Sequence, residues 1–183
     1  MNDLLARAIA AHGGLERWNT FNKLTATVLA GGGLRPMKGL EGDTTPRERA
    51  VTLHEETTCI SPFGQPDWRM AFTPDRVAIE TTTGAVVSER SNPRAAFAGH
   101  VLETVWDPLH NAYFGDDFLL RRHDYHLDVA GRVPVAQYVY DMVEADGFRC
   151  PTKRRMYVRG PGLKPIRDLL LISLDLSNFR LTT

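Results

Sequence analysis

The chain has 183 residues, 43% of them hydrophobic and 24% charged, and this length predicts a single domain, residues 1–183, with one core. Lysine plus arginine and aspartate plus glutamate each total 22 residues, so the formal charge is zero. No overall field therefore attracts nucleic acid or an anionic membrane surface, and we expect no nucleic-acid partner.

The first residues lack the pattern of a secretory leader. Asp3 precedes the apolar positions and Arg7 lies among them, whereas a signal peptide has a basic start followed by an uninterrupted apolar run. No apolar run approaches the roughly 20 residues that span a bilayer. We therefore expect a soluble, cytoplasmic protein without an integral membrane segment.

Two helices are predicted at the start of the chain. Residues 3–12 have helical periodicity, and Gly13-Gly14 follows as a stop signal. The apolar stripe of this first helix consists of Leu4, Leu5, Ala8, Ile9 and Ala11. A second, short helix is expected from Leu15 to Phe21.

From Leu24 the periodicity changes from helical to two, which is typical of a strand with one buried face. The Gly/Pro-rich tract "GGGLRPMKGLEGDTTP" then predicts a connection with one short strand near Met37. Residues 47–60 are interpreted as one long strand.

A meander of short strands is predicted next. Trp68, Met70 and Phe72 alternate with polar residues, and "TPDR" supplies a turn. Val77 and Ile79 then alternate in the same way, and "TTTG" supplies another turn before residues 85–89 return. Such short turns make the neighbouring strands antiparallel.

Two Asn-Pro or Asp-Pro pairs, at Asn92 and Asp107, each combine a helix-capping residue with proline at the first helical position. We expect short helices there, the second carrying Leu109, His110, Tyr113 and Phe114. Strands follow at 119–129, 134–144 and 148–158, and a last strand at 169–181.

These elements together predict an α+β fold. About eight to ten antiparallel strands should curl into a half-barrel, because large sheets twist instead of lying flat. The two N-terminal helices and the short helical lid around Asp107 would cover its open mouth. A curled sheet of this kind encloses a cavity, which is the expected ligand site.

The stretch "LLRRHDYHLDV", residues 119–129, is the densest group of polar side chains. On a strand, Arg121, His123 and Tyr125 share one face, and the residues between them, including Asp124, share the other. His123 and Asp124 therefore cannot form a hydrogen-bonded pair. The inward set could bind the head group of a ligand, or could simply bond to backbone and carboxylates.

No metal site or cofactor is expected. Asp124 and His126 share a face but lack a third ligand, and His54 lies outside any HExxH helix. Gly31-Gly32-Gly33 lacks the Lys-Ser/Thr of a phosphate-binding loop. Cys59 and Cys150 are expected to be buried thiols, with one disulfide as the alternative.

Three groups of residues carry a family resemblance. They are "AHGGLERWNTFNKLTATV", then "FTPDRVAIETTTGAVVSER" with "NPR", and finally "LLRRHDY", "VEADGFRCPTKRRMYV" and "LLLISLDLSNFRL". They resemble an uncharacterised bacterial family that is similar to the lipoprotein-localisation carriers, the LolA-like proteins. That resemblance implies a half-open antiparallel barrel with a helical lid and an apolar cavity for acyl chains.

The chain departs from this family in two respects. The carriers are exported, whereas no leader is recognised here. Between "WDPLHNAYF" and "LLRRHDY" this sequence has only Gly115, two aspartates and Phe118, where the relatives have a longer aromatic-rich segment. A shorter lid would leave the cavity shallower or more open.

Three functions follow as hypotheses. The first is binding of a lipid or another hydrophobic small molecule by Trp68, Met70, Phe72, Val77 and Ile79 in the sheet and His110, Tyr113 and Phe114 at the mouth. The alternative is an enzyme acting on an apolar substrate, with His123 as general acid or base, Tyr125 as proton donor and Arg121 stabilising negative charge. The third is a homo-oligomer formed through an exposed sheet edge.

Overall fold

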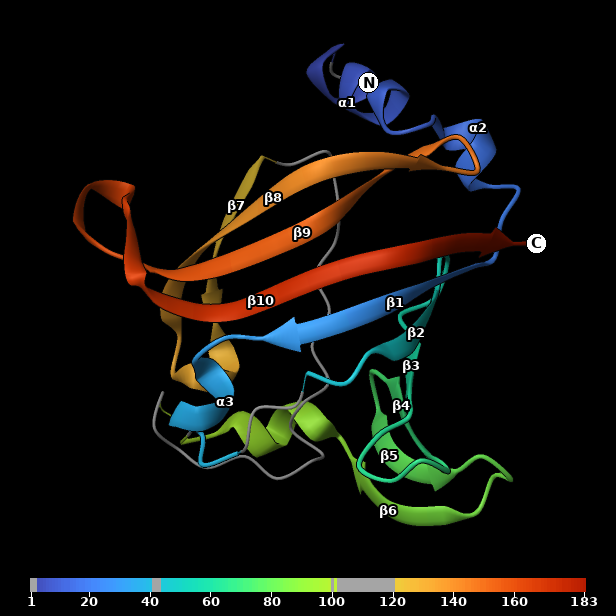
Figure 1. The fold of residues 1–183 in the computed structure, drawn as a ribbon, viewed down its shortest axis with the longest axis vertical. Helices are drawn as coiled ribbons and strands as arrows, with labels where there is room; N and C mark the ends of the chain where they lie inside the picture. Colours follow the sequence, from blue (N-terminus) through green and yellow to red (C-terminus); the bar gives the residue numbers. More distant parts are fainter. Residues whose placement is uncertain (1–2, 41–43, 100, 102–120) are drawn as a thin grey trace.

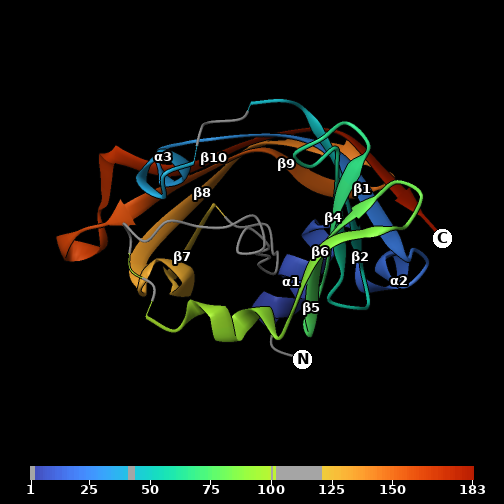
Figure 2. The ribbon, with the colours of Figure 1, turned by 90° about the horizontal axis from the view of Figure 1, so that it is seen from below.

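The computed structural model describes residues 3–40, 44–99, 101 and 121–183. Its main feature is a single antiparallel sheet of ten strands, in the order β6-β5-β4-β3-β2-β1-β10-β9-β8-β7. The sheet curls without closing, and Figure 2 shows it as an arch. The predicted α+β half-barrel is confirmed. The strands are β1 (Lys23–Gly31), β2 (Arg47–Thr52), β3 (Thr58–Ser61), β4 (Trp68–Thr73), β5 (Arg76–Thr81), β6 (Val86–Ser91), β7 (Arg122–Leu127), β8 (Val133–Ala145), β9 (Phe148–Arg159) and β10 (Pro165–Thr182).

The chain order of the strands explains how the arch is assembled. Two meanders, β1 to β6 and β7 to β10, each pair strands that follow one another in sequence. The C-terminal strand β10 pairs with β1, with Val28 opposite Leu176, and so joins the two meanders. Strands β6 and β7 lie at the two ends of the sheet (Figure 1). Self-association through one of these edges stays a prediction.

The helices are short and lie at the margins of the sheet. Both N-terminal helices are confirmed, as α1 (Asp3–Ala11) and α2 (Leu15–Trp18). The helix expected at Asn92-Pro93 is the 3₁₀ helix η1 (Pro93–Phe97). Two more 3₁₀ helices occupy turns, η3 (Asp128–Ala130) and η4 (Pro161–Leu163). The lid helix predicted from Asp107 lies outside the described residues.

Two predicted elements were wrong. Residues 47–60 form the hairpin β2–β3 and not one strand, and the Thr52 hydroxyl donates to the Glu55 carbonyl oxygen at 2.6 Å inside the turn. This turn contains no glycine, proline, asparagine or aspartate, so its sequence did not indicate a turn. The short strand expected near Met37 is instead the helix α3 (Leu34–Met37), which contacts β10.

Cross-strand pairing divides the sheet into a concave and a convex face. Phe97 of η1, which lies across the open side of the arch in Figure 2, packs against a cluster that includes Val135 and Met156. Those residues therefore mark the concave face. The register carries this face around the whole sheet, through Leu174 and Val28 to Met70 and Ile79.

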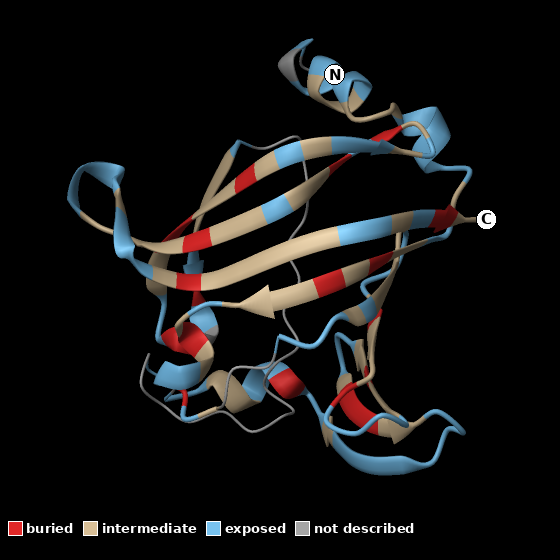
Figure 3. Ribbon diagram, in the orientation of Figure 1, coloured by how far each residue is buried: buried red, intermediate tan, exposed pale blue. Residues whose placement is uncertain are grey.

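The described residues form three buried clusters instead of one continuous core, and buried segments are scattered along the strands in Figure 3. The β7 cluster contains Leu34, Leu127, Ala130, Val135, Met156 and Leu171. The β4 cluster contains Phe63, Met70, Val77 and Ile79. The third contains Phe148, Cys150 and Leu181. The first two clusters belong to opposite arms of the arch.

The N-terminal helices are held by the turn between β8 and β9. Trp18 makes an edge-to-face contact with Phe148, with ring centroids 6.2 Å apart. Gly13 has φ +126°, and a Cβ there would lie 2.7 Å from the Gly147 carbonyl oxygen. Only glycine combines that backbone angle with so close an approach. The helices are therefore tied to one end of the sheet (Figure 1).

Candidate functional site

Within the polar stretch at residues 119–129, the edge strand β7 covers Arg122–Leu127, and the described residues face as predicted except at Arg121. His123 lies opposite Gln137, and Tyr125 lies opposite Val135, on the concave face. The rings of His123 and Tyr125 are 4.8 Å apart between centroids. Asp124 is on the convex face, so no bond joins it to His123.

The Tyr125 side chain bonds to neighbouring side chains of the sheet. Its hydroxyl donates to Oε1 of Gln137 at 3.0 Å and approaches Sδ of Met156 at 3.6 Å. Burial raises the pKa of Tyr125 to about 12, an effect that the charge of Arg154 partly opposes. At neutral pH the phenol is therefore protonated and already bonded.

Arg121 departs from the inward set. It lies one residue before β7 begins and is exposed, so the expectation that it is buried with His123 was wrong. The prediction assumed regular strand geometry from residue 119 onward, whereas Arg121 is in a bend. Catalysis by His123, Tyr125 and Arg121 stays a prediction.

The apolar residues predicted to contact a ligand gather on the concave face of β4 and β5. Met70 is opposite Ile79, and Phe72 is opposite Val77. Met70 and Val77 are fully buried, whereas Phe72 and Trp68 are half-buried beside them. Their role as ligand contacts stays a prediction. The other predicted contacts, His110, Tyr113 and Phe114, lie outside the described residues.

Arginines on the concave face were missed by the sequence analysis. Arg49 of β2 pairs with Ala26 and Ile60, and Arg154 of β9 pairs with Val139 and Leu174. The sequence did hold a signal for Arg49, because it alternates in phase with the apolar Val51. A charged residue in phase with apolar neighbours on the inner face of a sheet is unusual and is a candidate functional position.

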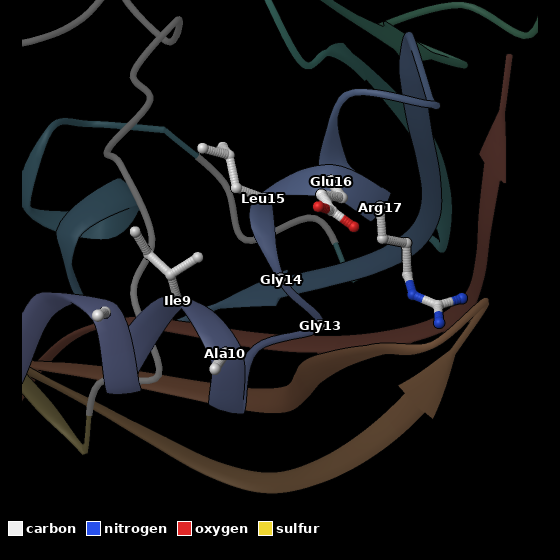
Figure 4. Close-up of a pocket in the computed structure, with 8 residues that line it drawn as sticks. Ile9, Ala10, Gly13, Gly14, Leu15, Glu16 and Arg17 are labelled. Carbon is white, nitrogen blue, oxygen red and sulfur yellow. The ribbon is translucent and has the colours of Figure 1, made fainter.

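A separate hollow lies at the elbow between α1 and α2 (Figure 4). It has a volume of about 420 Å³, and all of its lining residues lie within positions 6–17 of the chain. Its lining residues are Ala6, Ile9, Ala10, Gly13, Gly14, Leu15, Glu16 and Arg17. None of the predicted ligand contacts lines it.

Two further observations concern the described part of the chain. None of its helices is long and apolar enough to cross a membrane. No three histidine, cysteine, aspartate or glutamate side chains in it gather where they could hold a metal ion. Cys59 is half-buried, Cys150 is buried, and both are thiols.

Comparison with known proteins finds similarity in structure and none in sequence. No family model and no curated protein matches the sequence. Among solved structures, a LolA superfamily protein from Nitrosomonas europaea is similar, with a TM-score of 0.41 and 10% sequence identity over 97% of this chain and 94% of that chain. At this identity the likeness concerns the fold alone.

Proposed function

We propose that the protein binds a lipid or another small molecule with a long apolar part on the concave face of its half-open sheet. The observation that carries the proposal is the division of the buried side chains. The described residues bury apolar groups in separate clusters on opposite arms of the arch. A domain usually buries one contiguous core with smaller satellite clusters beside it, so two clusters on opposite arms support a ligand site on the face between them.

The half-buried residues on the concave face suit this role. Trp68, Phe72 and Ile60 border the fully buried Met70 and keep part of their surface accessible. An apolar ligand gains most where it covers such partly exposed aromatic and aliphatic side chains. A chain that buries about 300 Å² of apolar surface gains about 7 kcal/mol before the cost of association.

The first experiment asks whether an apolar probe binds. Purified protein is titrated with N-phenyl-1-naphthylamine, an uncharged dye that becomes fluorescent in an apolar site. We expect saturable binding in the micromolar range, and energy transfer from tryptophan to the dye, because Trp68 borders the site. An organic extract of the purified protein should contain an apolar small molecule, identified by mass spectrometry.

Two matched variants locate the site. Phe72→Ser removes a half-buried aromatic ring from the concave face, and Val86→Ser removes an exposed apolar side chain opposite Glu80 on the convex face. We expect about tenfold weaker dye binding in Phe72→Ser and no change in Val86→Ser. Absence of saturable binding, or equal loss in both variants, would reject the proposed function.

A further inference from the structure

The convex face of the arch carries three neighbouring tyrosines on β8 and β9. Asp124, which is on the convex face, lies opposite Ala136, and Ala136 lies opposite Tyr157. Tyr138 and Tyr140 follow Ala136 at two-residue intervals and so share this face. The ring centroid of Tyr138 is 6.3 Å from that of Tyr140 and 6.2 Å from that of Tyr157. The three half-buried rings therefore form one aromatic surface on the side of the sheet away from the proposed ligand site.

Arg167 of β10 lies over this aromatic surface and is exposed. Its Cζ is 4.9 Å from the ring centroid of Tyr138 and 5.0 Å from that of Tyr157. Hydrogen bonds to Tyr140 and Tyr157 raise the pKa of this guanidinium. The rings thus fix the orientation of an exposed cation. Within the part of the chain that the structure describes, Arg167 forms no ion pair with a carboxylate.

Two more arginines border the aromatic surface and share one carboxylate. Cζ of Arg122 is 5.4 Å from the ring centroid of Tyr138, and its Nη1 donates to the Tyr138 hydroxyl at 3.2 Å. Asp124 accepts from both Arg122 and Arg159. With Arg167 there are three guanidinium groups and one carboxylate, so these groups carry a net charge of +2. The tyrosine–arginine patch is defined as Tyr138, Tyr140, Tyr157, Arg122, Arg159 and Arg167.

Exposed aliphatic side chains adjoin the patch. Nη2 of Arg122 donates to the carbonyl oxygen of Leu163 in η4, and Leu163 is 62% exposed. Ile166, at the start of β10, is 39% exposed. The connection between β9 and β10 that carries Leu163 extends beyond the sheet in Figure 1. A molecule that docks on the patch can therefore cover aliphatic as well as aromatic surface.

This composition is typical of the centre of a protein interface, where tyrosine and arginine are enriched and dominate the binding energy. A guanidinium that two rings already hold loses little conformational freedom on binding. Its remaining N–H groups match the oxygens of a carboxylate. An anionic membrane is a poorer match, because it is usually bound by flexible basic segments or by an amphipathic helix, whereas these guanidinium groups are held against a sheet.

We propose that the tyrosine–arginine patch docks a segment of a partner protein in which aspartate or glutamate side chains alternate with apolar ones. A carboxylate of that segment bonds to Arg167, and an apolar side chain covers Leu163 and the edges of the tyrosine rings. This docking site is separate from the proposed function, because the patch is convex and the ligand surface is concave. A docked partner therefore leaves an apolar ligand in place.

Two blocked hexapeptides test the recognition of charge. Acetyl-Asp-Leu-Glu-Asp-Leu-Glu-amide and acetyl-Asn-Leu-Gln-Asn-Leu-Gln-amide differ only in their carboxylates. Each is titrated into the unaltered, ¹⁵N-labelled protein at pH 7, and binding is followed by the chemical shifts of backbone amides. We expect the acidic peptide to bind with a Kd of about 0.1–1 mM and the amide peptide about tenfold more weakly. The largest shifts should fall on β8, β9 and the start of β10.

Variants then assign the preference to Arg167. Arg167→Gln should weaken binding of the acidic peptide about tenfold and leave the amide peptide unchanged. Arg180→Gln is the matched control and should bind both peptides as the unaltered chain does. It removes the same charge from an exposed convex position at the other end of the same strand. Arg167→Lys keeps the charge but loses the planar guanidinium, and should retain only part of the preference.

Three outcomes overturn the docking site. They are equal binding of the two peptides, shifts confined to the concave face, and equal losses in Arg167→Gln and Arg180→Gln. Because the two peptides are compared on the unaltered chain, that comparison remains decisive if a variant fails to fold. Co-sedimentation with vesicles of phosphatidylcholine and phosphatidylglycerol that Arg167→Gln abolishes, without peptide binding, assigns the patch to an anionic membrane and also overturns the proposal. The dye titration tests the proposed function separately, and its result is independent of all these outcomes.

Discussion

Asp124 on the convex face gives a prediction that can be worked out from the geometry. Its carboxylate accepts from Nε and Nη2 of Arg122 at 2.6 and 2.7 Å, and from Nη1 of Arg159 at 3.1 Å. The bond from Arg159 connects β7 to β9 across β8, and the two bonds from Arg122 hold the carboxylate in place within β7. We expect Asp124→Asn to weaken this connection at the edge of the sheet and to lower the free energy of unfolding.

The size of the loss depends on exposure. The Asp124 side chain is 26% exposed, that of Arg122 31% and that of Arg159 18%, so solvent screens the bonds in part. Charge-assisted bonds contribute about 1.5–3 kcal/mol when buried and exposed ion pairs about 0–1 kcal/mol. We therefore expect a loss of about 2 kcal/mol at pH 7, or about 4–8 °C in Tm.

The loss should also depend on pH. The hydrogen bond from Arg122, followed by that from Arg159, lowers the pKa of Asp124 below its usual value. A carboxyl group with a lowered pKa in the folded state contributes its stability above the pKa of the unfolded chain, about 3.9. The difference between wild type and Asp124→Asn should be full at pH 7 and shrink as the pH falls below about 4.

Urea denaturation followed by circular dichroism, at pH 7 and at stepwise lower pH, measures this difference. Asp168→Asn is the control, because Asp168 is an exposed carboxylate on β10, and we expect it to change stability by less than about 0.5 kcal/mol. The reasoning is refuted if both variants lose the same amount, or if the Asp124→Asn deficit is undiminished at about pH 2.

Two further predictions concern other parts of the fold. Gly13→Ala should lower the free energy of unfolding, measured by urea denaturation, by about 1–3 kcal/mol. The loss should exceed that of Gly84→Ala, because both glycines have positive φ but only a Cβ at Gly13 would approach another atom, the Gly147 carbonyl oxygen at 2.7 Å. Equal losses in the two variants would contradict the close contact. Tyr125→Phe removes the bond donated to Gln137 and should cost about 1 kcal/mol at pH 7. Since burial raises the pKa of Tyr125 to about 12, the stability that this phenol contributes should be present below about pH 10 and decline above it, because the unfolded chain ionises first; an unchanged difference between wild type and Tyr125→Phe at pH 8 and pH 11 would contradict this.

Local alternation in the sequence determined the strands and the faces of most of their residues. A strand turns its side chains to opposite sides at every residue, so Met70 with Phe72, and Val77 with Ile79, could be placed together without a structure. The same rule separated His123 from Asp124. It failed where local bonding replaced the regular strand, at the β2–β3 turn and at Arg121, because short-range side-chain bonds and bends leave no periodic signal.

The candidate site depended on tertiary structure. Alternation could place Arg49 on the buried face of β2, but nothing near it in sequence indicates Arg154. The pairing of β1 with β10 joins the two arms and places both residues on the concave face of one sheet. The sequence by itself determined a sheet with one apolar face, because that pattern repeats every two residues. Only the tertiary structure decided which distant charges share that face, because strand order and curvature arise from contacts along the whole chain.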